Sequence, residues 1–160
     1  MKKLWAPWRM EYVTEEKTDE CIFCTAPDKK PEDSLVLFNG ALSTVLLNKY
    51  PYNNAHLLLA PKKHKANLED LGVEESVDLQ RLMRHSVMVL KKHFKPDGMN
   101  IGLNLGSAAG AGITDHLHWH IVPRWEGDTN FMTTVGDISV IPEHILKTQE
   151  KLRPFFENIG

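Results

Sequence analysis

The most informative stretch of the sequence reads HLHWHIVPR at residues 116–124. Its three histidines fall at alternate positions, and a β-strand sends successive side chains to opposite faces. The three imidazoles are therefore predicted to share one face, with neighbours roughly 6–7 Å apart. The other face is predicted to enter the core through Leu117, Trp119 and Ile121. A surface strand with incidental histidines is the alternative, but eight histidines in 160 residues seldom fall in this register.

Composition indicates one globular domain. The chain of 160 residues is 42% hydrophobic and 25% charged, which suits a single domain over residues 1–160 with its own core. A formal net charge of −2 argues against nucleic acid as a partner, so a nucleotide partner is expected to be small and bound in a pocket. No apolar stretch approaches membrane-spanning length, and residues 1–9 do not form a signal peptide. A cytoplasmic protein that contacts no membrane is therefore expected.

The two cysteines, Cys21 and Cys24, form a Cys-x-x-Cys pair. In a reducing compartment this spacing favours half of a metal site or a redox dithiol over a structural disulfide. A thioredoxin-like dithiol would need a preceding strand and a helix opening at the motif, which the polar residues 17–20 and Pro27 do not supply. A closed tetrahedral zinc site needs two more ligands. The histidine candidates are His56, His64, His85, His93, His144 and one member of the triad, although His85 and His93 lie in a helical segment.

Hairpins dominate the rest of the predicted pattern. Strands over residues 34–38 and 41–48 are joined by Asn39-Gly40, a strong signal for a tight antiparallel hairpin. Residues 56–60 predict a short buried strand ended by Pro61, and residues 99–105 alternate toward another strand. Asn104, between two leucines, is expected to face outward to a site.

Two helices are predicted. Between residues 72 and 96, apolar residues recur at steps of three and four, which indicates one amphipathic helix. Its predicted core stripe is Leu79, Met83, Val87, Leu90 and Phe94. A final helix is predicted over residues 142–157, with its buried side formed by Ile145, Gln149, Leu152 and Phe156. Strands and helices together indicate the α+β class.

A glycine-rich segment at residues 106–115 lies between the last of these strands and the triad. Small residues let backbone N–H groups approach an anion closely. The segment matches neither a Walker loop nor a dinucleotide fingerprint, so a phosphate cradle and plain hairpin geometry are both open interpretations.

The triad segment resembles the His-φ-His-φ-His-φ-φ signature of the histidine triad (HIT) family of nucleotidyl hydrolases and transferases. Order, spacing and the trailing Pro123-Arg124 all agree. Other segments resemble the bacterial branch related to diadenosine tetraphosphate phosphorylases, so that the resemblance runs from about residue 4 to residue 142. These segments are residues 4–10, 47–58, 61–64, 102–106 and 125–131.

The resemblance implies an antiparallel sheet of about five strands with helices on one side, in a homodimer. It also implies a structural zinc ion, because zinc-bearing members combine a Cys-x-x-Cys pair with a Pro-x-x-His histidine and the first triad histidine. Two sulfurs and two nitrogens would close the site. The implied ligands are Cys21, Cys24, His64 and His116. The two cysteines belong to an N-terminal zinc-binding segment at residues 17–28.

The resemblance also implies catalytic roles. His118 would attack an α-phosphorus and form a nucleotidyl-histidine intermediate, and a protonated His120 would stabilise charge in the transition state. The implied adenine-nucleotide contacts are Leu46 and Leu58 at the base, Asn48 at the ribose, Asn104 beside the nucleotide, and the backbone amides of Gly110, Ala111 and Gly112 at the phosphates. The two leucines could instead belong to the core, and Asn48 could cap a turn.

This sequence departs from the family pattern at two positions that bear on which molecule accepts the nucleotidyl group. The dinucleoside polyphosphate hydrolases carry Gln four residues before the first triad histidine and Ser or Thr three before it, whereas this chain has Gly112 and Ile113. Without these water-handling side chains, inorganic phosphate is favoured over water as acceptor. Two other readings stay open: a hydrolase whose triad binds a catalytic metal, which would leave Cys21 and Cys24 without obvious partners, and a noncatalytic nucleotide-binding protein.

Overall fold

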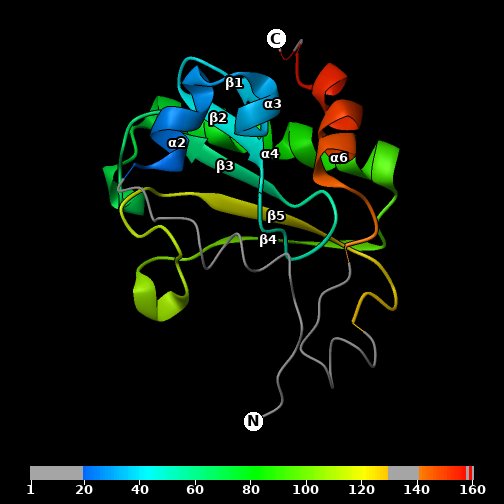
Figure 1. Ribbon diagram of the computed structural model, residues 1–160. Coiled ribbons are helices and arrows are strands. Elements are labelled where there is room, and N and C mark those ends of the chain that lie inside the picture. Colours follow the sequence, from blue (N-terminus) through cyan, green and yellow to red (C-terminus); the bar gives the residue numbers. More distant parts are fainter. Residues whose placement is uncertain (1–19, 130–140, 158, 160) are drawn as a thin grey trace.

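The computed structural model of the chain describes residues 20–129, 141–157 and 159 (Figure 1). Several sequence features lie outside the described residues: the segment at residues 4–10, the start considered as a signal peptide, residues 17–19 before the cysteine pair, and residues 130–131. Among the described helices, none is long and apolar enough to cross a membrane.

One five-stranded antiparallel sheet organises the described part of the chain, with strand order β1-β2-β3-β5-β4. The strands are β1 (Val36–Asn39), β2 (Ser43–Leu47), β3 (Leu57–Pro61), β4 (Gly98–Leu103) and β5 (Trp119–Arg124). Because β3 pairs with β5 rather than with β4, the triad strand lies inside the sheet and β4 forms its edge. The predicted α+β class with an antiparallel sheet of about five strands is confirmed.

The long helix α4 (Val73–Phe94) matches the predicted helix between residues 72 and 96. It begins where the Glu75 carboxylate accepts the backbone N–H of Gly72 at 2.8 Å, and it ends at Lys95, whose φ of 48° is left-handed. The shorter helical elements are α2 (Ile22–Thr25), α3 (Pro31–Ser34), α6 (Ile145–Leu152), and the 3-10 turns η1 (Ala26–Asp28), η2 (Leu68–Asp70), η3 (Ser107–Ala109) and η4 (Arg153–Phe155).

The buried stripe of α4 is broader than predicted. Leu79 and Leu90 are buried as expected, but Leu82 and Val89 are buried as well. Two other predicted members, Met83 and Phe94, are only partly buried at the margin of the core, and Val87 is partly exposed. The reason is that α4 packs against the sheet, which covers a wider arc of the helix than a single line of residues.

The last helix is shorter than the predicted span of residues 142–157. The ring of His144 accepts the backbone N–H of Leu146 at 3.3 Å and starts α6. Pro154 has no N–H and its ring would clash with the carbonyl four residues earlier, so the chain continues as η4 after Leu152. The predicted inner side is confirmed at Gln149, Leu152 and Phe156, which are buried.

The first hairpin is antiparallel as predicted, but its turn is not the two residues Asn39-Gly40. Asn39 pairs with Thr44, and the backbone N–H of Gly40 donates to the carbonyl of Ser43 at 3.0 Å. Gly40 is not among the glycines with positive φ. Its lack of a side chain matters because a Cβ would lie 2.6 Å from the ring of Phe38.

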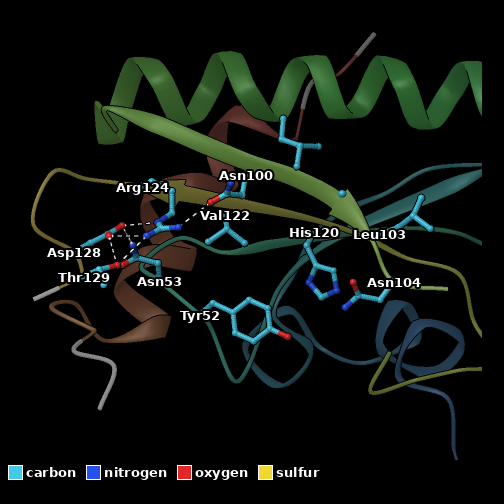
Figure 2. Close-up of a pocket in the computed structure, with 12 residues that line it drawn as sticks. Tyr52, Asn53, Asn100, Leu103, Asn104, His120, Val122, Arg124, Asp128 and Thr129 are labelled. Carbon is cyan, nitrogen blue, oxygen red and sulfur yellow. Dashed lines mark hydrogen bonds and ion pairs between the residues drawn. The ribbon is translucent and has the colours of Figure 1, made fainter. Parts of the chain in front are cut away.

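Strands β2 and β3 are buried on both faces, and this arrangement decides where a site can open. On one face, α4 and α6 pack against apolar side chains including Val45, Leu57 and Ile121. On the other face, Phe23 of α2 packs against a small apolar cluster of Leu46, Leu58 and Ala60. In Figure 2, α4 runs on one side of β4 and β5, whereas His120 and Asn104 lie on the other side.

Candidate functional site

The triad lies where the chain enters β5, next to β3. Leu58 pairs with His120, so His120 faces the same side of the sheet as the apolar cluster. The strand begins only at Trp119, so His116 and His118 precede it rather than lying within it as predicted. The ring centroids of His118 and His120 are nonetheless 5.0 Å apart, and the predicted convergence of the imidazoles is confirmed for this pair.

His116 is fully buried, and its hydrogen bonds determine its tautomer. Its Nε2 lies 2.8 Å from the backbone oxygen of Pro61. A carbonyl oxygen only accepts, so Nε2 carries the proton and Nδ1 keeps a lone pair. That Nδ1 lies 3.2 Å from Sγ of Cys21 and 3.6 Å from Sγ of Cys24. Pro61 therefore holds His116 in the form that a metal ligand requires.

The residues expected to bind zinc converge at this point. The ligand atoms of Cys21, Cys24, His64 and His116 all lie within 4.8 Å of one another, and Sγ of Cys24 is 3.3 Å from Nδ1 of His64. A tetrahedral zinc ion with two sulfur and two nitrogen ligands has edges of roughly 3.3–3.8 Å. Donor chemistry and spacing therefore fit zinc, with small movements of the side chains.

The other histidine candidates for this metal site lie elsewhere. His85 bonds through Nε2 to the backbone oxygen of Phe155 at 2.8 Å, and His93 stacks on the Phe155 ring with centroids 3.7 Å apart. His144 caps α6, and His56 contacts His120 of the triad from the position just before β3. Within the described residues, the cluster of side chains that could hold a metal ion contains His116 but neither His118 nor His120. This arrangement does not support a metal centre formed by the three triad histidines.

His118 has one nitrogen committed to the backbone. Its Nδ1 lies 2.9 Å from the carbonyl oxygen of His116, so Nδ1 is the protonated nitrogen and Nε2 carries the lone pair. The residue is 6% exposed, and burial lowers the pKa of His118 below its ordinary value. A neutral imidazole with a fixed lone pair is the form that a nucleophile needs.

His120 is oriented by His56, a residue that sequence reasoning considered only as a metal ligand. The backbone N–H of Tyr52 donates to Nδ1 of His56 at 3.1 Å, so the proton of His56 resides on Nε2. This Nε2 lies 2.9 Å from Nδ1 of His120. The remaining nitrogen of a neutral His120 is therefore an N–H donor.

Electrostatics keep this pair uncharged. Burial, reinforced by the neighbouring imidazoles, lowers the pKa of His56 to about 3 and that of His120 to about 4. His120 was expected to act in its protonated form. In the free protein it is instead a neutral donor, and an anionic phosphate beside it would raise its pKa.

The implied base contacts are in the apolar cluster. Leu46 and Leu58 are each 4% exposed and pack with Phe23, whose ring centroid is 4.9 Å from that of His118. Asn48 turns toward the backbone, since its Oδ1 accepts the N–H of Tyr50 at 2.9 Å and its Nδ2 lies 3.3 Å from Nδ1 of His56. The nucleotide roles of Leu46, Leu58 and Asn48 stay predictions.

The glycine-rich segment is a compact loop around η3. The amides of Gly110 and Ala111 donate within it, to Ser107 at 2.9 Å and to Gly106 at 3.3 Å, so these two would bind a phosphate only after the loop rearranges. A Cβ at Gly112 would meet no atom within 4 Å. Ile113 packs against the apolar cluster, and this contact anchors the loop.

A trench runs along β4 and β5 from His120 toward Arg124 and Asp128 (Figure 2). It is lined by residues 52 and 53, residues 100–104, the β5 residues His120, Val122 and Arg124, and residues 128 and 129, and its volume is about 480 Å³. This is within the range of small-molecule sites. Of the predicted nucleotide contacts, Asn104 lines the trench, and its Nδ2 donates to the backbone oxygen of Gly110 at 3.4 Å.

Three features together define a histidine triad protein. They are an α+β fold with one antiparallel sheet, three alternating histidines at the start of β5, and a cluster of cysteine and histidine side chains around the first of these histidines. A family model described as the HIT domain matches residues 29–127. The chain belongs to this family, and the resemblance drawn from the motifs is confirmed.

Relatives with described activities lie close in sequence. The AP-4-A phosphorylase of Mycobacterium tuberculosis is 39% identical over 161 residues, which cover 95% of this chain and 83% of that protein. The bis(5′-adenosyl)-triphosphatase of Dictyostelium discoideum is 32% identical, covering 78% of this chain and 87% of that protein. A solved histidine triad nucleotide-binding protein of Sulfolobus tokodaii matches with a TM-score of 0.68 at 27% identity, covering 86% and 92% of the two chains.

Proposed function

We propose that this protein transfers a nucleotidyl group from a dinucleoside polyphosphate, such as diadenosine tetraphosphate, to inorganic phosphate through a covalent intermediate on His118. The observation that carries the proposal is the 2.9 Å bond from Nδ1 of His118 to the carbonyl of His116, which leaves Nε2 as the lone-pair nitrogen of a buried imidazole. Similarity to the AP-4-A phosphorylase over 95% of the chain supports the substrate class.

The reaction has two displacements at one phosphorus atom. First, Nε2 of His118 bonds to the α-phosphorus, the bridging P–O bond breaks, and ATP leaves as a stable anion. The Nε2–H of His120 would donate to a phosphate oxygen where charge develops. Second, an oxygen of inorganic phosphate bonds to the same phosphorus, the P–N bond breaks, and ADP is released from a regenerated His118.

We propose a structural zinc ion on Cys21, Cys24, His64 and His116. When bound, the ion would serve as a crosslink and would supply no chemistry to the reaction. The residues that hold it join three separate segments: the α2 turn, the loop after β3 and the approach to β5. The nucleophile is two residues from His116, so this crosslink would keep its backbone in position.

Water is the competing acceptor, and a hydrolase of the same nucleotides is the second candidate function. Similarity to the bis(5′-adenosyl)-triphosphatase supports it. Gly112 and Ile113 stand where the hydrolases of the family carry water-handling side chains, which favours phosphate. The open space at the Cβ position of Gly112 supports the same choice.

A product assay decides between the two acceptors. Diadenosine tetraphosphate is incubated across a titration of inorganic phosphate, and the nucleotides are separated by chromatography. The proposal expects equal amounts of ADP and ATP at a rate that depends on phosphate, with slow release of AMP in its absence. Equal amounts of AMP and ATP at a rate that ignores phosphate would establish the hydrolase.

We infer that the chain forms a homodimer through β4. In the described part of the sheet this strand has one neighbour, β5, and its exposed edge includes Ile101, which is 43% exposed. Exposed strand edges are templates for pairing with another chain. Sedimentation of the purified protein tests the inference. The cytoplasmic location indicated by the sequence stays a prediction.

A further inference from the structure

We propose that the trench beyond His120 binds the nucleoside of the leaving nucleotide, with Tyr52 as its stacking surface. The enzyme would then prefer substrates that carry a second nucleoside over substrates that end in a bare polyphosphate. This inference rests on the proposed function, because it concerns the leaving group of that reaction. It is carried by the position of the trench, by the neutralised charge of its floor and by the exposed ring of Tyr52.

One wall of the trench runs along β5, away from the triad. His120, Val122 and Arg124 alternate along β5, so they face the same side of the sheet and form one wall. At a rise of roughly 3.3 Å per residue, Arg124 lies about 13 Å farther along β5 than His120. In the proposed reaction, the leaving group departs from the phosphorus on the side opposite the nucleophile, and a leaving group that accepts the hydrogen bond of His120 would lie at the start of this wall.

The charged groups at the far end cancel one another. The guanidinium of Arg124 donates Nε–H to Oδ2 of Asp128 at 2.7 Å and Nη2–H to Oδ1 at 2.8 Å, a bidentate pair. Its Nη1 donates to Oδ1 of Asn100 at 2.9 Å, and Asn53 donates to the same carboxylate at 2.8 Å. The Arg124 hydrogen bonds hold the pKa of Asp128 well below its ordinary value, so the carboxylate remains charged.

This pairing decides which part of the leaving nucleotide fits. A polyphosphate is recognised by cationic groups whose donors are free to meet its oxygens. Here Nε, Nη1 and Nη2 of Arg124 all donate to protein groups, and Asp128 balances the charge of the guanidinium, so the pair offers no net positive charge to a phosphate. The rest of the lining combines amide groups of Asn100 and Asn104 and the hydroxyl of Thr129 with the apolar side chains of Ile101, Leu103 and Val122. An electrically balanced surface with both amide and apolar groups suits a sugar and a base.

Tyr52 supplies the aromatic surface. The residue is 61% exposed, so its ring is available to a ligand. One side of it meets His120, with ring centroids 5.8 Å apart and planes inclined by 22°. Figure 2 shows the ring opposite β5, between His120 and the Arg124–Asp128 pair. Stacking on such a ring tolerates any base, because every base has a π face.

The test compares two substrates that break the same bond. Attack on diadenosine tetraphosphate releases ATP, whereas attack on the α-phosphorus of adenosine 5′-tetraphosphate releases inorganic triphosphate. The readout is the ratio of kcat/KM for the first substrate to that for the second. We expect Tyr52→Ala to lower this ratio about fivefold or more and Tyr52→Phe to retain it. Tyr50→Ala is the matched control, since Tyr50 does not line the trench.

A second variant fills the trench instead of emptying it. A Cβ at Gly102 would meet no atom within 4 Å, and a β-branched residue is compatible with a strand, so Gly102→Val should fold and obstruct the nucleoside. It should lower the same ratio. The proposal would be overturned if Tyr52→Ala lowered kcat/KM equally for both substrates and Gly102→Val left the ratio unchanged. Tyr52 would then serve only to support His120.

Binding separates this inference from the proposed function. Calorimetry measures the affinity of the two nucleotides for His118→Ala, with and without the additional substitution Tyr52→Ala. Because this variant lacks the proposed nucleophile, binding is measured without turnover. Suppose that wild-type protein forms no nucleotidyl adduct, but Tyr52→Ala still weakens the binding of diadenosine tetraphosphate and not that of adenosine 5′-tetraphosphate. The trench would then be confirmed as a nucleoside site, and the proposed reaction would be refuted. If the adduct forms and the two nucleotides lose affinity equally, the trench proposal falls.

Discussion

Nε2 of His56 lies 2.9 Å from Nδ1 of His120, and this bond joins a fully buried imidazole to the last member of the triad. The direction of the bond is set from the backbone, because the N–H of Tyr52 occupies Nδ1 of His56. A residue that precedes β3 thus decides which nitrogen of His120 carries the proton.

The first prediction concerns this bond. His56→Phe keeps a ring in the buried position but removes the donor, so Nδ1 of His120 loses its partner. We expect kcat to fall about 10- to 100-fold while zinc content is unchanged. Heteronuclear NMR should show the Nε2-protonated tautomer of His120 in wild type and a mixture in the variant. A wild-type rate in the variant would show that the tautomer is set otherwise.

The second prediction is a loss of stability in acid that originates in His56. The folded protein holds the pKa of His56 at about 3, whereas the unfolded chain has a value near 6.5. Between these values the unfolded chain binds more protons, so stability is fully present above pH 6.5 and is lost as the pH falls toward 3. Urea unfolding at pH 7 and pH 5 should show a smaller difference in His56→Phe than in wild type. Equal differences would contradict the assignment.

The third prediction identifies the nucleophile. His118→Ala should lower turnover by more than about 10⁴-fold and leave the fold intact, because His118 is not a predicted zinc ligand. Mass spectrometry of wild-type protein quenched during turnover should show a nucleotidyl adduct on His118. His85→Ala is a suitable control, since its ring bonds to Phe155 away from the triad. A near-normal rate in His118→Ala would assign the attack to another group.

The fourth prediction concerns zinc. Purified protein should contain one zinc ion per chain, and Cys24→Ser should lose it. Because the ligands are far apart in the unfolded chain, removing the ion should lower Tm by about 10 °C or more. Elemental analysis and thermal unfolding with and without a chelator measure both effects. Stoichiometric zinc in Cys24→Ser would refute the ligand set.

The fifth prediction tests the acceptor at Gly112. Gly112→Gln places an amide where the hydrolases of the family carry one, and the backbone leaves room for it. Release of AMP in the absence of phosphate should rise about tenfold. Gly112→Ala fills part of the space without an amide and should not raise it. The same increase in both variants would mean that crowding of the loop, not an oriented water, is responsible.

The sequence by itself determined the local features. Alternation at residues 116–124 identified β5 from Trp119 onward but placed its start too early, and steps of three and four identified α4, because these periods depend only on backbone geometry. The turn after β1 was missed in detail, because the reason for Gly40 is a close approach of the Phe38 ring and not the φ of a tight turn. The family motifs added a predicted set of zinc ligands and predicted roles for the triad histidines, and the structure brings the four predicted ligands together.

The tertiary structure alone decided which distant atoms meet. The contact between Cys21 and His116 spans 95 positions, and the bond between His56 and His120 spans 64. Both depend on the register that places Leu58 opposite His120, and a shift of one residue would turn each side chain to the other face. The tautomers of the triad histidines and the neutralisation of the Arg124 charge by Asp128 depend on donors and acceptors that lie about 3 Å apart. No periodicity in the sequence encodes these separations.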